Sequence, residues 1–416
     1  MKDHNHNPSK FFPKLINVQV HLLNLLSCFL IFGGGLLLGI VLASSYLKDS
    51  SFILQIAQLS ISSSSSSSSS PSNNADITHE LYSPNDSVTM SNMTEVHVGA
   101  FEEFLKPPKV WHDMDDEELF WRASMAPRIS EYPFHRVPKV AFMFLTKGPI
   151  HLAPLWEKFF QGHQGLYSIY IHSDPSYNES SHTESPIFHG RRIPSQRVEW
   201  GHVNLIEAES RLIANALLDI SNQRFVLLSE ACIPLFNFST VYSYLMNTNQ
   251  TFVQVYDDPS AVGRGRYSES YYPQITLDQW RKGSQWVEMD RDLAIEVVSD
   301  QKYYTTLQKL CVGYCFADEH YLPTFMNIRF PEKNSNRSVT WVDWTRGGPH
   351  PVEYASTDVT VELLNILRTS TWCEYNGRGT NVCFLFARKF APNSLDNLLR
   401  IAPQVMQFDT DIRSTS

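Results

Sequence analysis

The chain of 416 residues lacks the short motifs that mark several large enzyme classes. No GxGxxG follows a strand-like run and no GxxxxGK[ST] occurs, which argues against a dinucleotide fingerprint or a P-loop. HExxH, GxSxG and paired CxxC motifs are also missing, and Cys311-x-x-x-Cys315 alone is a weak metal signal. The chemistry must therefore come from residues outside these motifs.

Positive charge is scarce as well. The chain has 34 Lys and Arg against 43 Asp and Glu, for a net charge of -9, and no basic domain stands out. This balance argues against a nucleic-acid partner. Its 43% hydrophobic and 12% aromatic residues support a substantial core and supply aromatics for a binding site.

Charged residues are absent between Lys14 and Lys48. Within this gap, residues 21–47 are apolar for longer than the roughly 20 residues that span a bilayer. A cleaved signal peptide has a shorter apolar core, although Ala43-Ser44-Ser45 resembles a cleavage site. Because three lysines and one acid precede the run, we expect residues 1–20 in the cytosol and 21–47 as an uncleaved signal-anchor.

Residues 48–105 are predicted to form a disordered luminal stem. They include nine consecutive serines, Ser62 to Ser70, and few large apolar side chains to offset the entropy of ordering. Asn-x-Ser/Thr sequons lie only beyond the predicted anchor, which agrees with a luminal location. The candidate glycosylation sites are Asn85, Asn92, Asn178, Asn237, Asn249 and Asn336.

The remaining residues, 106–416, are predicted to form a single catalytic domain. Strand-like runs at 139–146, 166–172, 224–228 and 251–256, with a short one at 198–200, alternate with helical patterns at 152–160, 207–220 and 240–246. Such alternation predicts an α/β fold with a mostly parallel sheet. Ligands bind at the carboxyl ends of such strands, so Thr146, Asp174 and Ser229-Glu230 are predicted to share one rim.

Asp113-Met-Asp115 spells the Asp-x-Asp pattern that many sugar-nucleotide enzymes use for a metal. Those motifs normally follow a core strand, whereas this one precedes every predicted strand. We therefore expect Asp115 to cap the helix that follows it, and no metal site here.

The stretch CVGYCFADEHYLPT, from Cys311 to Thr324, sets Asp318 and Glu319 among apolar and aromatic residues. One hypothesis is that these acids open a helix, where the macrodipole favours negative charge. The other is that one of them is a general base whose proton affinity is tuned by burial. Taken alone, the stretch favours the helix start.

Three further segments carry unusual residues. The strand-like run 384–390 ends in Arg388 and Lys389, whose charges call for either a carboxylate or a ligand diphosphate. Arg266 lies in the predicted loop GRGRYSESYY, and Trp344 lies in WVDWTRGGPHP. An indole ring such as that of Trp344 can stack on a sugar, but a tryptophan more often anchors a core.

Six stretches in order are familiar: KVAFMFLTKGP, LYSIYIHSDPSY, RFVLLSEACIPL, FADEHYLPT, WVDWTRGGPHP and LFARKFAP. Together they resemble the plant branch of the core-2/I-branching β-1,6-N-acetylglucosaminyltransferase-like family, over residues 112–408. The resemblance implies a GT-A-like fold and inverting transfer from a UDP-sugar without a metal or other cofactor.

Motif by motif, the resemblance implies roles for individual residues. Glu319 would be the catalytic base, Lys389 with Arg388 would contact the UDP diphosphate, and Asp174 would lie near the uridine. Thr146 joins the donor-binding candidates, while Arg266 and Trp344 are the acceptor-binding candidates. A second diphosphate-binding arginine has no clear counterpart, and both Arg368 and Arg378 remain open.

The combined expectation is a single-pass type II Golgi membrane enzyme that transfers a sugar, N-acetylglucosamine by resemblance, to a glycan or glycoprotein. Glucuronosyl or pentosyl transfer to wall polysaccharide or arabinogalactan is one alternative, and a non-catalytic glycan-binding protein is another. In an oxidising lumen most cysteines pair, and short loops favour Cys311 with Cys315 and Cys373 with Cys383, leaving Cys232 free.

Overall fold

The computed structural model describes residues 106, 108–129, 132–177 and 185–408. All of them belong to the second of two compact units, Thr94–Ser416. The predicted tail, anchor and stem lie outside the described residues, as do Asn85, Asn92 and Asn178. Among the residues that are described, no helix combines the length and apolar character needed to cross a membrane.

The centre of the unit is a four-stranded sheet in the order β2-β1-β3-β5. Strands β1 (Lys139–Leu145), β2 (Tyr167–His172) and β3 (Asn222–Ser229) are parallel, and β5 (Glu288–Asp290) runs antiparallel to β3. The prediction of a mostly parallel sheet is confirmed. The apolar run in β1 is nearly continuous because both faces of a parallel sheet are covered.

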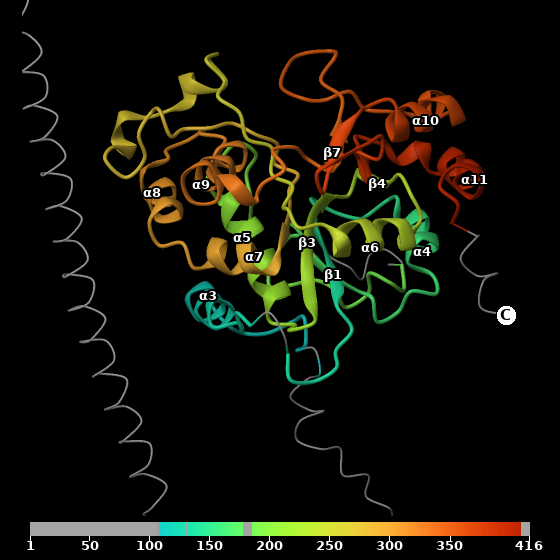
Figure 1. Cartoon of the computed structure of the whole chain (residues 1–416), viewed down its shortest axis with the longest axis horizontal. Coiled ribbons are helices and arrows are strands. Elements are labelled where there is room, and N and C mark those ends of the chain that lie inside the picture. Colours follow the sequence, from blue (N-terminus) through green and yellow to red (C-terminus); the bar gives the residue numbers. More distant parts are fainter. Residues whose placement is uncertain (1–105, 107, 130–131, 178–184, 409–416) are drawn as a thin grey trace, which may run out of the picture. The chain divides into compact units, whose positions relative to one another are not determined.

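Two layers of helices cover the sheet. Figure 1 shows α4 (Ala153–Phe160) and α6 (Phe238–Asn247) on one side of β1 and β3, and α5 (Asn204–Leu217) and α7 (Arg291–Val298) on the other. Alternate side chains of β1 point to opposite faces of the sheet. Phe142 packs in the core beneath α4 and α6, and Met143 packs in the core beneath α5 and α7. The other α-helices are α3 (Asp116–Ser124), α8 (Tyr303–Leu310), α9 (Tyr321–Arg329), α10 (Val361–Thr369) and α11 (Leu395–Val405).

A second, smaller sheet has the order β4-β9-β6. Strand β9 (Phe386–Arg388) pairs antiparallel with β4 (Ile233–Pro234) and parallel with β6 (Thr340–Val342). Since β4 follows β3 after a turn of a few residues, this sheet brings the C-terminal part of the chain beside the carboxyl end of β3. Strands β7 (Cys373–Tyr375) and β8 (Arg378–Thr380) form a separate hairpin.

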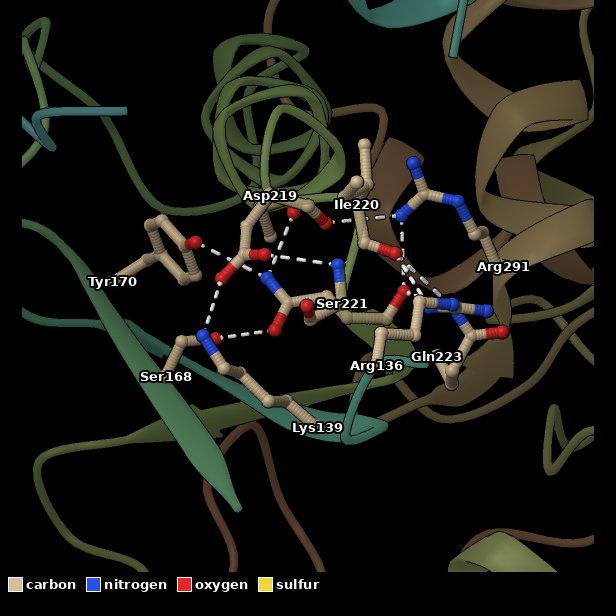
Figure 2. Close-up of polar contacts among 11 residues, drawn as sticks. Arg136, Lys139, Ser168, Tyr170, Asp219, Ile220, Ser221, Gln223 and Arg291 are labelled. Atoms are coloured by element: carbon tan, nitrogen blue, oxygen red, sulfur yellow. Dashed lines mark hydrogen bonds and ion pairs between the residues drawn. The ribbon is translucent and has the colours of Figure 1, made fainter. Parts of the chain in front are cut away.

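At the opposite, amino end of the sheet, a polar network joins α5 to β3 (Figure 2). Asp219 forms an ion pair with Lys139 at 3.0 Å and accepts a 2.9 Å bond from the Ser221 backbone. Arg291, the first residue of α7, donates to the carbonyls of Leu217, Asp219 and Asn222. The last carbonyls of a helix have no intrahelical partner, so Arg291 satisfies groups that burial would otherwise leave unpaired.

Several local predictions can be compared with these elements. Asp115 is the N-cap of α3 and accepts from Glu118 N at 2.8 Å, so the capping prediction is confirmed. The predictions of strands at 198–200 and 251–256 are wrong. The first is an irregular approach to a turn, and the second makes only isolated bridges, because loop groups such as Lys333 O and Asn334 Oδ1 accept from its backbone.

Arg224 and Glu288 form the buried ion pair that ties β3 to β5. Two bonds of 2.7 Å join them, and the Glu288 side chain is fully buried. Burial raises the pKa of Glu288 to about 7, although Arg224 acts in the opposite direction. The Glu288 side chain therefore depends on Arg224 to be ionised inside the core.

Replacing Arg224 with Ala should destabilise the fold by about 3–5 kcal/mol, because a buried charge then loses its partner. Chemical denaturation of the purified folded unit measures this loss. Arg122→Ala, which breaks a solvent-exposed pair with Glu118, is the matched control and should change the free energy of unfolding little. Equal effects of the two substitutions would contradict the prediction.

Candidate active site

The carboxyl ends of the parallel strands place the first two candidates together. Thr146 follows β1, and its backbone N–H donates to His172 O of β2 at 2.9 Å. The Thr146 hydroxyl is buried and has no hydrogen-bond partner in the described part of the chain. Asp174, two residues beyond β2, accepts from the Ser176 hydroxyl and backbone, and these bonds lower its pKa. Thus Thr146 and Asp174 share one rim, as the strand pattern predicts.

Arg388 and Lys389 reach the same rim from the second sheet. Phe390 N donates to Ala231 O at 3.0 Å, which sets the end of β9 beside the turn after β3. The Arg388 guanidinium lies 4.1 Å over the Trp286 ring, and burial lowers its pKa. Lys389 lies 3.3 Å from Glu353, with both side chains well exposed. Lys389 thus has the carboxylate partner that was one of the two hypotheses, and such an exposed pair is weak enough to be exchanged for a ligand.

Glu319 lies in the short 3-10 helix Ala317–Glu319, between α8 and α9. Arg266 Nη1 contacts its Oε2 at 2.6 Å, and Lys282 Nζ donates to the same oxygen. Burial acts to raise the pKa of Glu319, but Lys282 and Arg266 outweigh it, so the pKa lies below its usual value. Glu319 is therefore ionised at neutral pH, and neither cation uses its second oxygen, Oε1.

The segment from Lys282 to Trp286 connects this carboxylate to the rim. Its first residue contacts Glu319, Gly283 N donates to the Glu319 carbonyl at 2.9 Å, and Trp286 lies under Arg388. Four residue steps of extended chain cover at most about 14 Å. Glu319 and Arg388 are thus held at the two ends of one short segment.

Comparison with known proteins shows which family the chain belongs to. Residues 140–368, more than half of the chain, match the family model described as Core-2/I-Branching enzyme. The chain belongs to the core-2/I-branching enzyme family. It is also 34% identical over 297 residues to a rice (Oryza sativa subsp. japonica) protein named Glycosyltransferase BC10, a match that covers 61% of this chain and 73% of that protein.

The core-2/I-branching chain is accordingly a glycosyltransferase, and its family implies a nucleotide-sugar donor and a glycan acceptor. The matched range includes Thr146, Asp174 and Glu319, whereas Arg388 and Lys389 lie beyond it. Within the described residues, no group of three or more His, Cys, Asp or Glu side chains is arranged to hold a metal ion.

Asp318 does not open a regular helix, which was one of the two hypotheses for the adjacent acids. The residue that precedes the 3-10 helix is Phe316, in the left-handed region at φ 49°, and no side chain caps that helix. The Asp318 carboxyl turns inward, is 8% exposed, and its Oδ1 has no partner among the described groups. The two acids open no regular helix together, because one faces cations and the other faces the core.

A second buried acid lies near Asp318. Glu209 of α5 is 4% exposed and accepts a 2.9 Å bond from Gln285. Burial raises the pKa of Glu209 well above its usual value, and the Asp318 charge adds to the effect. Burial likewise raises the pKa of Asp318 to about 7, with Glu319 as the next contributor. Asp318 and Glu209 are thus favoured as neutral acids beside an ionised Glu319.

The two acceptor-binding candidates lie in different surroundings. Arg266 is bound to Glu319 and also lies 3.9 Å over the Phe316 ring. Trp344 is 50% exposed and follows β6, whose Val342 is paired with Arg388. Trp344 therefore lies two residues beyond the strand partner of Arg388.

The sequence reasoning missed Lys282, Trp286 as the support of Arg388, and Glu209. The sequence offered one signal, the glycine at position 283 directly after Lys282, and the structure shows its reason: a Cβ there would collide with Gln254 O and Pro323. Of the two open arginines, Arg368 donates to Val405 O and lies 4.4 Å over Phe236, whereas Arg378 is exposed on β8. Neither placement assigns the second diphosphate contact.

The cysteine pairs agree with the short-loop prediction. Disulfides join Cys311 to Cys315 and Cys373 to Cys383, with Cα–Cα distances of 5.9 and 5.8 Å, and Cys232 is buried and unpaired. The Cys311 disulfide closes the loop directly before Glu319.

One glycosylation candidate needs correction. Asn237 is 7% exposed, caps α6 through Thr240 N and donates to Gln407 O, so its amide is engaged in the fold. Asn249 and Asn336 are exposed and remain candidates.

Asp318→Asn should change how stability depends on pH. Because the folded-state pKa of Asp318 is about 7, against 3.8 for an ordinary aspartate, this carboxyl binds more protons in the folded chain than in the unfolded chain between these values. The contribution of Asp318 to stability therefore falls as pH rises from about 4 to about 7, and the amide removes this contribution. The denaturation midpoint of the variant, measured relative to wild type, should therefore rise across that range. Exposed Asp396→Asn should keep the wild-type slope, and parallel slopes for Asp318→Asn would refute the prediction.

Proposed function

We propose that this glycosyltransferase is an inverting, UDP-sugar-dependent enzyme that works without a metal and uses Glu319 as its general base. The observation that supports this most strongly is the Glu319 carboxylate, ionised by Arg266 and Lys282, with Oε1 left unused by both cations. A base must be deprotonated before the acceptor arrives, and these contacts meet that requirement.

The proposed reaction is a single displacement. An acceptor hydroxyl attacks the anomeric carbon of the donor on the face opposite UDP, and its proton passes to Glu319 as the new bond forms. The bond between the anomeric carbon and the UDP oxygen breaks, and UDP leaves with the electron pair. Arg266 and Lys282 also weaken the base, so acceptor binding that loosens one of these contacts would raise the proton affinity of Glu319 when it is needed.

The departing UDP gains negative charge, which fixed cations can stabilise. Lys389 is the better placed of the two candidates, because its exposed pair with Glu353 can be exchanged for a diphosphate oxygen. Arg388 is held against Trp286, and its positive charge stabilises the departing UDP electrostatically from that position. Asp174 and Thr146, at the ends of the neighbouring strands, complete the proposed donor side.

For the donor sugar we propose N-acetylglucosamine, and for the location a type II orientation in the Golgi membrane. The first rests on family membership, and the second on the apolar run 21–47 with lysines before it. Glucuronosyl or pentosyl transfer to wall polysaccharide or arabinogalactan is the second candidate, since pocket shape decides the sugar.

A panel of UDP-sugars tests the proposal directly. The purified chain should release UDP or transfer sugar from one donor, and turnover by Glu319→Gln should fall by about 10²- to 10⁴-fold, the usual contribution of a general base. Because Gln leaves Arg266 and Lys282 without their charge partner, thermal unfolding should show some loss of stability in a chain that still folds and binds UDP, and Glu332→Gln, an exposed glutamate, is the control. Near-normal turnover by Glu319→Gln would remove it from the mechanism, and a folded wild-type chain that is inactive with every donor would favour a non-catalytic glycan-binding protein.

Lys389→Ala should weaken UDP binding and slow transfer, because one charge that stabilises the leaving group is lost. Calorimetric titration with UDP measures the first effect, in the presence and absence of EDTA. The wild-type chain should bind UDP and turn over equally in both. Lys109→Ala, at an exposed site outside the rim, should behave as wild type. Strict dependence on added manganese would contradict the metal-free mechanism.

A further inference from the structure

An exposed row of aromatic side chains begins at the candidate base. Arg266, bound to Glu319, lies 3.9 Å over the Phe316 ring. The Trp200 ring meets Phe316 edge-on at 5.1 Å, and His350 lies 5.3 Å from Trp200. These contacts link Trp200 and His350 to the Glu319 carboxylate through Phe316 and Arg266.

The outer rings of this row are open to solvent. Trp200 is 46% exposed, and Tyr314, which contacts His202 and lies 6.3 Å from Phe316, is 68% exposed. Large aromatic side chains are usually buried, and a contiguous exposed group of them marks a binding surface. We call Trp200, Tyr314, Phe316 and His350 the aromatic platform.

The backbone fixes the platform before any ligand arrives. Phe316 N donates to Gly201 O at 2.8 Å, and the Cys311–Cys315 disulfide closes the loop that carries Tyr314. Gly201 has φ +79°, and a Cβ at that position would lie 2.9 Å from Tyr314 and 3.0 Å from Phe316. The glycine thus lets the turn and the loop approach closely, and a pre-ordered surface loses less entropy on binding.

We propose that the aromatic platform binds saccharide units of the acceptor that lie next to the unit being modified. This inference rests on the proposed function of Glu319. The continuity of the row with that carboxylate favours a glycan over a protein partner, because an acceptor chain entering the site must leave it along an adjoining surface. Indole and phenol rings offer flat apolar faces to sugar rings, with polar edges for their hydroxyls. The platform would therefore select acceptors of several sugar units over single sugars.

The test uses Trp200→Ala and series of β-linked galacto-, xylo- and gluco-oligosaccharides of one to six units. For the series that serves as acceptor, the wild-type KM should fall as length increases. Trp200→Ala should raise the KM of the longer members about tenfold, as truncation of a central aromatic contact does, while kcat and the KM of the shortest acceptor stay unchanged. Trp121→Ala, on α3 and 59% exposed, is the matched control.

A binding measurement separates this inference from the proposed function. Calorimetric titration of the same oligosaccharides requires no turnover. Length-dependent binding that Trp200→Ala weakens would support the platform even if no donor is transferred, in which case the proposed function alone fails. Transfer without length dependence, or equal affinities of wild type and Trp200→Ala for every series, would overturn the platform and leave a protein partner as the occupant to examine.

Discussion

A single carboxylate oxygen, Oε2 of Glu319, joins three separate parts of the chain. It contacts Arg266 from the loop after Gly263 and Lys282 from the segment before β5, while Glu319 itself lies between α8 and α9. Charges that are largely removed from water must be compensated by partners. This requirement holds the loops in one arrangement, and both the rim at the strand ends and the aromatic platform are attached to them, through Trp286 and Phe316 respectively.

Adjacent acids in this glycosyltransferase differ in charge because their surroundings differ. Glu319 faces two cations, which lower its pKa, whereas Asp318 is buried near Glu209 and has a raised pKa. Perturbed acids gather at functional sites, where one group must carry charge and its neighbour must not add to it. Burial favours the protonated form of Asp318, which reduces its repulsion of the ionised Glu319 and suits its packing into the core.

The parallel topology explains why distant candidates share an edge. Thr146 and Asp174 follow adjacent strands, and the second sheet brings Arg388 and Lys389 to the end of β3. Motif order alone could place these residues in a family, but tertiary contacts put Arg388 and the candidate base Glu319 at opposite ends of the segment from Lys282 to Trp286. In the proposed reaction, this separation keeps the leaving group and the attacking hydroxyl on different sides of the sugar.

Features with local causes could be predicted from the sequence alone: the three parallel strands, the Asp115 cap and the two short-loop disulfides. Apolar periodicity, a capping oxygen and a small loop each act within a few residues. Tertiary structure decided the rest. The pairing of Lys282 with Glu319, the burial of Asp318 and the isolated bridges of 251–256 depend on contacts between residues far apart in the chain. Local pattern carries no information about which distant group will supply the compensating charge or hydrogen bond.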